Sequence, residues 1–203
     1  MATERTQTDK KFLAELARGG FAESLTPPQR RQIHIQTGLD SFLEDALDDG
    51  KQVVLTGNPG DGKTQHILMQ QDNYPEDEYF YLLDASEYAD YHDLLEEWNE
   101  NFQDGVAGIL AVNDGPLYEM TTQYRDEYEF LGTIQKQLQN QIIYDESDTD
   151  KIDFEDIVVV DLNNQDVLTH SIIRKAIENF AGDFAMDGHS HPGRCHIQYN
   201  AEK

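Results

Sequence analysis

Cysteine, basic side chains and long apolar runs are all scarce in this 203-residue sequence. Cys195 is the only cysteine, which excludes an internal disulfide and fits a reducing compartment. The longest apolar run, residues 105–112, is much shorter than the roughly 20 residues of a membrane-spanning helix. The opening "MATERTQTDKK" contains no apolar segment of the kind found in a secretory signal. These absences predict a cytoplasmic protein with no membrane partner.

Basic residues are outnumbered by acidic ones, 15 to 40, which gives a formal charge of −25. The carboxylates recur along the chain, in residues 40–49, 72–78, 87–100 and 145–156. A hydrophobic content of 38%, with ten tyrosines and nine phenylalanines, favours a folded chain over a disordered one. Acidity spread this widely is typical of adaptation to very high salt, where repulsion is screened within about 3 Å at about 1 M.

The same charge balance argues against direct DNA binding. Arg30 and Arg31 form the most evident basic pair, and two charges make a poor patch on a strongly acidic chain. Counter-ion release also contributes little at high salt. We therefore expect any contact with DNA to come through partner proteins.

Apolar segments with strand character alternate with segments of helical periodicity. Strands are predicted over 52–56, 78–85, 105–112 and 157–164. Helices are predicted over 33–47, 63–71, 88–102, 124–138 and 165–180, with Gly50 just after the first of these. This alternation predicts an α/β fold of three layers, in which a mostly parallel sheet has helices on both faces.

The two ends of the chain are less regular. Residues 1–30 are predicted to form an N-terminal arm, in which Pro27 and Pro28 end a short helix. Residues 31–203 are predicted to form the core, with "CHIQY" at 195–199 as a candidate fifth strand. A zinc site in the same region is the less favoured interpretation of His189, His191, Cys195 and His196, because their spacing matches no common structural-zinc pattern.

Residues 53–67, "VVLTGNPGDGKTQHI", contain the most specific motif. The pattern G-x-x-x-x-G-K-[ST] is matched in full by Gly57, Asn58, Pro59, Gly60, Asp61, Gly62, Lys63 and Thr64. Glycines allow successive backbone N–H groups to point into one concavity, and the start of the next helix adds further unpaired N–H groups. Lys63 is expected to reach the β- and γ-phosphates, and Thr64 to ligate Mg²⁺. The motif therefore predicts a loop that binds ATP and Mg²⁺. The alternative is a glycine turn with an incidental Lys-Thr pair.

Asp61 is an unusual neighbour for a phosphate. An inward carboxylate would repel the nucleotide at close range, so its side chain is expected to point outward. A catalytic carboxylate is expected elsewhere, at the end of a strand beside the loop strand, where it can hold the metal's water and polarise the attacking water. Asp84, Asp114 and Asp161 all lie at or just beyond the apolar part of a predicted strand, at its carboxyl end. The alternative for each is an Asp that caps the following helix.

Three stretches together suggest a family. "GNPGDGKT", "GILAVNDGPL" and "IVVVDLNN" resemble the ATPase component of phosphorothioation-dependent DNA restriction systems, the DptF-like proteins, over about residues 33 to 200. The resemblance implies an AAA-type P-loop ATPase, in which Asn113 and Asp114 occupy the positions of the two acids. Asp114 is then the activating acid and takes part in holding Mg²⁺, partly through water, while Asp161 or Asn163 is a sensor of the γ-phosphate. The chain ends where an AAA-type lid would begin, so it is expected to be a fragment or a reduced version.

The function expected from these features is ATP hydrolysis that drives a multiprotein restriction or defence assembly acting on DNA. Two alternatives stay open, a nucleotide-binding switch or scaffold with negligible turnover and, less favoured, a small-molecule kinase. Asn113 in place of an acid and the short Asp114 in place of Glu favour the switch. The sequence leaves open whether the chain forms a homo-oligomer.

Overall fold

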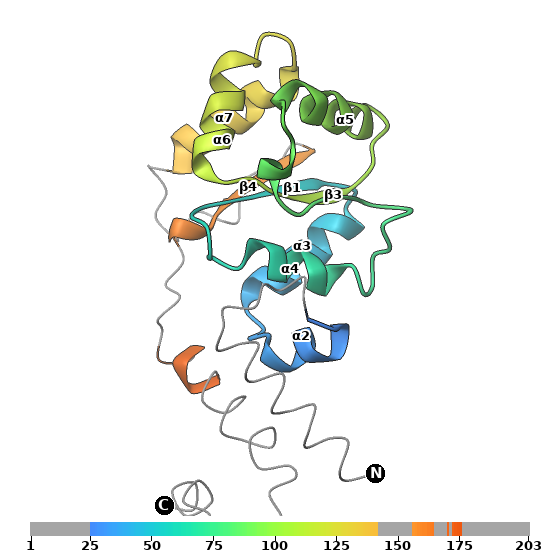
Figure 1. Cartoon of the computed structure of the whole chain (residues 1–203), viewed down its shortest axis with the longest axis vertical. Helices are drawn as coiled ribbons and strands as arrows, with labels where there is room; N and C mark the ends of the chain where they lie inside the picture. The colour runs from blue at the N-terminus through green and yellow to red at the C-terminus, as the bar shows by residue number, and fades with distance from the viewer. Residues whose placement is uncertain (1–24, 142–155, 165–169, 171, 176–203) are drawn as a thin grey trace, which may run out of the picture. The chain divides into compact units, whose positions relative to one another are not determined.

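The computed structural model describes residues 25–141, 156–164, 170 and 172–175 (Figure 1). The chain divides into two units, residues 36–165 and residues 1–35 with 166–203, which are described separately. The larger of the two contains the sheet and all the motif residues discussed below.

The sheet of the larger unit has four parallel strands, β1 (Gln52–Thr56), β2 (Phe80–Leu82), β3 (Gly108–Ala111) and β4 (Ile157–Asp161). Their order is β2-β3-β1-β4, so β3 and β4 flank β1 on opposite sides. The register pairs Leu55 with Ala111 and Thr56 with Asp161. The carboxyl ends of these three strands therefore meet at one edge of the sheet, where open α/β sheets bind ligands. The α/β class and parallel sheet predicted from the sequence are confirmed.

Helices cover both faces of this sheet (Figure 1). On one face pack α5 (Tyr91–Gln103), α6 (Asp114–Gln123) and α7 (Glu129–Gln141), around the fully buried Trp98. On the other lie α3 (Gly38–Asp48) and α4 (Lys63–Gln70). Residues of β1 alternate between the two apolar clusters, with Val54 in the first and Val53 and Leu55 in the second. This arrangement is compatible with three layers, and its buried strand explains the uninterrupted β-branched run.

The helices differ from the predicted ones in two places within this unit. The helix predicted over 33–47 begins at Gly38, because Thr37 and Asp40 form a capping box there. The segment before 124 was not predicted as helical, yet α6 spans it, and 124–128 joins α6 to α7. Its sequence "DGPLYEMTTQ" has a weak apolar periodicity, and Pro116 is tolerated because it lies in the first turn. Tyr124 and Tyr128 pack against the apolar cluster from the connection itself.

In the smaller unit, the structure describes helix α2 (Pro27–Ile33). The short helix that Pro27 and Pro28 are predicted to end lies outside the described residues, and the two prolines themselves begin α2. Proline suits the first helical positions, because the N–H that it lacks has no partner inside the helix. Thr26 and Gln29 complete the start with a capping box.

Several predictions lie outside the described residues. They include most of the helix over 165–180, the strand at 195–199, the zinc ligands and most of the arm. The 3-10 helices η2 (Ala85–Glu87) and η4 (Leu162–Asn164) complete the described elements of the larger unit. None of the helices that the structure describes is both long and apolar enough to cross a membrane.

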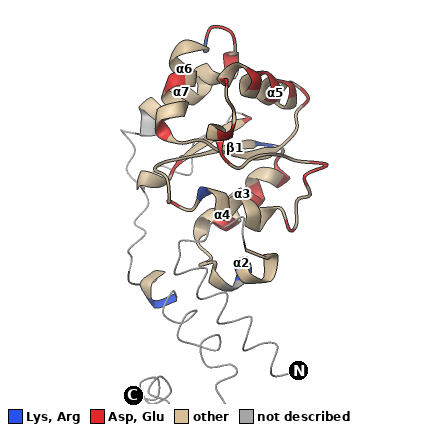
Figure 2. Ribbon diagram, viewed as in Figure 1, with Lys and Arg blue, Asp and Glu red and all other residues tan. Residues whose placement is uncertain are grey.

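Acidic side chains are spread over the elements of the larger unit rather than gathered in one patch. Figure 2 shows them along α3 and α5 and in the connecting loops, with few basic residues between them. Helix α5 carries Asp93, Glu96, Glu97 and Glu100 without a Lys or Arg. Its apolar stripe is nevertheless regular, with Leu94, Leu95 and Trp98 buried. On α5 the negative charge therefore lies on the solvent side of an ordinary core.

Candidate functional site

The glycine-rich loop between β1 and α4 has the backbone conformations that its sequence requires. Gly57, Gly60 and Gly62 have φ angles of 136°, 96° and 88°, which other residues rarely adopt. Gly62 is the N-cap of α4, so the helix starts at Lys63 and its first N–H groups lie at the end of the loop. A side chain at Gly57 would meet Asp61 Oδ2 at 2.7 Å and Leu162 Cβ at 3.4 Å. The loop thus has the glycine conformations and the helix start that anion-binding turns require.

Lys63 is buried, with 7% of its surface exposed, and its Nζ donates to the carbonyl of Asn58 at 2.8 Å. Burial lowers the pKa of Lys63, because a charged ammonium loses hydration. The carboxylates of Asp61, Asp114 and Asp84, in that order, oppose this change. The ammonium therefore lies in a cluster of negative charge, within the curve of the loop.

Asp61 does not point away from the loop as expected. Its Oδ2 accepts the backbone N–H of Asn58 at 2.6 Å, and its charge is the one that acts most strongly on Lys63. The physical reason is that the loop N–H groups and the ammonium attract a carboxylate as they would a phosphate. Asp61 thus serves as an internal anion of the loop.

Asp114 lies just after β3, at the first position of α6, and both of its carboxylate oxygens are held. Oδ1 accepts the hydroxyl of Thr56 at 2.7 Å, and Oδ2 accepts the side-chain amide of Asn163 at 2.8 Å. Thr56 is the last residue of β1, and Asn163 follows β4. Three neighbouring strand ends therefore meet at this one carboxylate.

Asn163 links this carboxylate to the glycine-rich loop. Its Oδ1 accepts the side-chain amide of Asn58, while its Nδ2 donates to Asp114. The backbone N–H of Asn163 donates to Asp161 Oδ1 at 2.9 Å. Asp161 thus shapes the turn that presents Asn163. Of the two residues predicted as alternatives for the sensor, Asn163 contacts the loop, and Asp161 supports the turn before it.

Asp84 follows β2, which pairs only with β3 among the described strands. Its Oδ1 accepts the backbone N–H of Ser86 at 2.8 Å, the helix-capping role that we considered as the alternative for all three acids. The hydroxyl of Thr64 donates to the carbonyl of Leu83 at 3.4 Å, a long contact. Of the three candidate acids, Asp114 has the contacts that best fit a reactive position.

Asn113 is the N-cap residue of α6, but its side chain makes no capping hydrogen bond. Its Oδ1 is buried and has no hydrogen-bond partner in the described part of the chain. A buried acceptor without a donor is costly, so an oxygen of this kind suits a site that receives a ligand or water.

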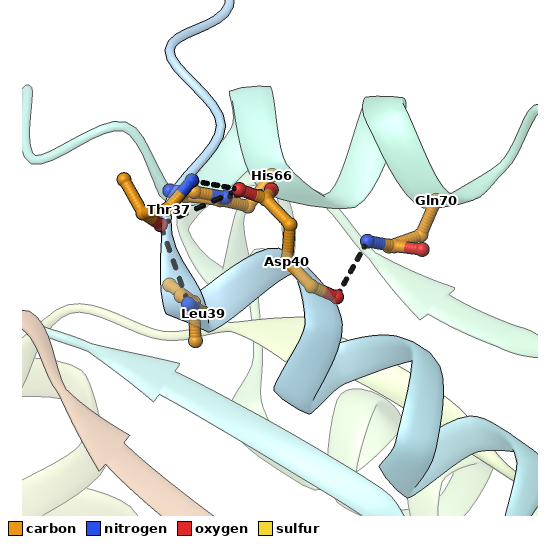
Figure 3. Close-up of polar contacts among 5 residues, drawn as sticks. All are labelled: Thr37, Leu39, Asp40, His66 and Gln70. Atoms are coloured by element: carbon orange, nitrogen blue, oxygen red, sulfur yellow. Dashed lines mark hydrogen bonds and ion pairs between the residues drawn. The ribbon is translucent and has the colours of Figure 1, made fainter.

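A polar contact between α3 and α4 orients the helix that begins at Lys63. Figure 3 shows Asp40, from α3, between Thr37 and His66. Asp40 Oδ2 accepts the N–H of Thr37 at 2.7 Å, and its Oδ1 lies 2.9 Å from His66 Nδ1. Gln70 donates to the Asp40 carbonyl at 3.3 Å. This contact fixes α4 against α3 at one face of the sheet, and so supports the position of the loop.

Sequence reasoning does not identify Thr56 as a site residue, because it stands at the end of a buried strand. It places Asn58 in the predicted loop, but not the contact of its side chain with Asn163. A polar residue that ends an otherwise apolar strand, directly before a glycine-rich loop, was the available signal.

Comparisons with known proteins add no family to this description. The chain matches no protein-family model, no curated protein sequence and no solved structure.

Proposed function

We propose that this chain is a P-loop protein that binds ATP with Mg²⁺ and hydrolyses it. The observation that carries the proposal is the pairing of a complete glycine-rich loop with a carboxylate at the next strand end. Lys63 begins α4 at the end of that loop, and Asp114 is among the charges that act on it. A glycine turn alone would require neither the buried ammonium nor the held carboxylate.

The residues present fit a nucleotide phosphate and a magnesium ion. The loop offers backbone N–H groups and an ammonium, which suit an anion. Thr64, Asp114 and the buried Oδ1 of Asn113 offer oxygen atoms, the ligands that Mg²⁺ prefers, directly or through water. Mg²⁺ would neutralise charge on the phosphates that the loop holds.

Each side chain then has a distinct role. Lys63, which now donates to the Asn58 carbonyl, would contact the β- and γ-phosphates, and Thr64 would hold the metal. Asp114 orients the attacking water, since its carboxylate is exposed yet fixed by two donors. Asn163, which bonds to both Asn58 and Asp114, is the side chain that responds to the γ-phosphate.

The wider role is proposed from the sequence resemblance alone. It is that ATP turnover drives a DNA-directed restriction or defence assembly, with DNA contacted through partner proteins. The strand order places β3 and β4 on opposite sides of β1, so the ends of both strands lie beside the loop, and it does not select the AAA-type subclass. A nucleotide-binding switch is the second candidate, because Asn113 stands where a carboxylate is expected.

A phosphate-release assay in molar KCl, paired with calorimetric titration of Mg-ATP, tests the proposal. Lys63→Ala should weaken ATP binding by about 1.5–3 kcal/mol, because a charge-assisted contact is lost, and should abolish turnover. Lys136→Ala, which removes an exposed lysine of α7, is the matched control and should change neither. Tight binding without phosphate release would favour the switch. Unchanged ATP affinity in Lys63→Ala would rule out the assignment of the loop.

A further inference from the structure

Thr56 is the most deeply buried of the residues whose side chains form hydrogen bonds in the candidate site. Thr56 is 1% exposed, and its Oγ1 donates to Asp114 Oδ1 at 2.7 Å. Asp114 itself is exposed, so water can satisfy its carboxylate without help. Water cannot easily replace the acceptor for Thr56, because that hydroxyl lies inside the fold. The hydrogen bond from this buried hydroxyl therefore restricts the rotamer of Asp114.

The position of Thr56 is fixed because it ends a strand of the sheet. Val112 donates to the Leu55 carbonyl at 3.0 Å, which extends the pairing of β1 and β3 to the residues beside Thr56 and Asn113. Thr is β-branched, and its side chain has few rotamers in a strand. The second oxygen of Asp114 is held by Asn163, which lies after β4. Only Thr56 therefore holds the carboxylate from the strand that leads into the loop.

We propose that Thr56 is a positioning residue for Asp114. Its hydroxyl fixes the carboxylate in the orientation from which Asp114 can direct the attacking water toward the phosphates in the loop. This inference rests on the proposed ATPase function. Thr56 acts through Asp114, so its contribution should fall on turnover, while ATP binding depends on the loop and Lys63.

Thr56→Val tests the role because it keeps the branched shape and removes only the hydroxyl. We expect kcat for ATP to fall about tenfold to a hundredfold, the usual cost of losing a supporting contact in a reactive centre, with KM little changed. Thr56→Ser should recover most of the lost turnover. Thr121→Val is the matched control, because it removes another hydroxyl that is 1% exposed, one bonded to the Leu117 carbonyl in α6.

A double-mutant cycle separates positioning from a general loss of structure. In an Asp114→Asn background, Thr56→Val should have little further effect on kcat, because the group that it positions is already inactive. Calorimetric titration of Mg-ATP and thermal melts are recorded for each variant. Thr56→Ala is made in parallel, so that poor folding of the valine variant leaves a second measurement.

The outcomes distinguish this inference from the proposed function. Equal turnover in wild type and Thr56→Val overturns the role of Thr56 alone. So does an undiminished effect of Thr56→Val in the Asp114→Asn background, since the hydroxyl would then act by another route. Wild-type protein that binds ATP without releasing phosphate overturns the ATPase proposal, and the role of Thr56 with it.

Discussion

Asp114 follows β3 and Asp161 ends β4, the two strands that flank β1, but their carboxylates have different partners. Asp114→Asn should leave Mg-ATP binding nearly intact and reduce turnover on the order of a hundredfold, because the carboxylate acts mainly in the transition state. Asp161→Asn should be milder, since its Oδ1 can still accept the N–H of Asn163. Single-turnover phosphate release at saturating ATP measures both. A reversed ranking would move the reactive acid to β4.

Asp61 provides a second test at the scale of single residues, because it brings negative charge to the loop. Asp61→Asn should tighten Mg-ATP binding by about 0.5–1 kcal/mol, a small effect because molar salt screens exposed charges. The amide retains an oxygen to accept the N–H of Asn58. Asp126→Asn removes a charge from the connection between α6 and α7 and is the control in calorimetric titrations. Weaker binding in Asp61→Asn would mean that the carboxylate chiefly maintains the loop.

At the scale of elements, two glycines of the same unit should respond oppositely to alanine. A Cβ on Gly108 in β3 would lie 2.1 Å from the Phe80 carbonyl oxygen of β2, so the edge strand must shift. Gly132, in α7, has nothing within 4 Å of that position. Gly108→Ala should destabilise the fold by about 1–3 kcal/mol, as other overpacked cores do, whereas Gly132→Ala should stabilise it by about 0.5–1 kcal/mol. Urea denaturation in molar KCl measures both, and equal effects would contradict the close approach of β2 and β3.

The sequence allowed the elements to be predicted where its periodicity is strong and failed where local chemistry decides. The β-branched run of β1 and the apolar stripe of α5 identify a buried strand and an amphipathic helix without further information. Periodicity does not identify helix α6, because its apolar stripe is weak and Pro116 stands in its first turn. It does not identify α2 either, a helix of seven residues that begins with two prolines.

The candidate site was predictable only in its local part. The glycines, Lys63 and Thr64 lie within eight residues, so a motif describes them. The contacts of Asp114 with Thr56 and Asn163 join residues that are 58 and 49 positions apart in the chain. They depend on β3 and β4 lying on either side of β1, an order that periodicity does not determine. The direction of Asp61 likewise depended on the N–H groups of the folded loop.

Across the described part of the molecule, the acidic side chains other than the buried Asp40 are at least partly exposed. The apolar clusters on the two faces of the sheet resemble those of any α/β domain. Repulsion among surface carboxylates opposes the compact state and is weakened by salt. We therefore expect the free energy of unfolding to rise as ionic strength rises, although the packing of the core does not change.

Lowering KCl from about 1 M to about 0.1 M lengthens the screening distance from about 3 Å to about 10 Å, so the melting temperature should fall. Helix α5 offers an internal check, because Glu96 and Glu100 are exposed like charges four residues apart. Replacing both with Gln should stabilise the protein at 0.1 M KCl by about 0.2–0.5 kcal/mol, or about 0.5–2 °C for a chain of this size, and much less at 1 M. Circular dichroism melts of both proteins across the KCl series measure this. A wild-type melting temperature indifferent to KCl would show that the carboxylates are not an adaptation to salt, and an equal gain for the double variant at both concentrations would trace its effect to helix propensity instead of charge.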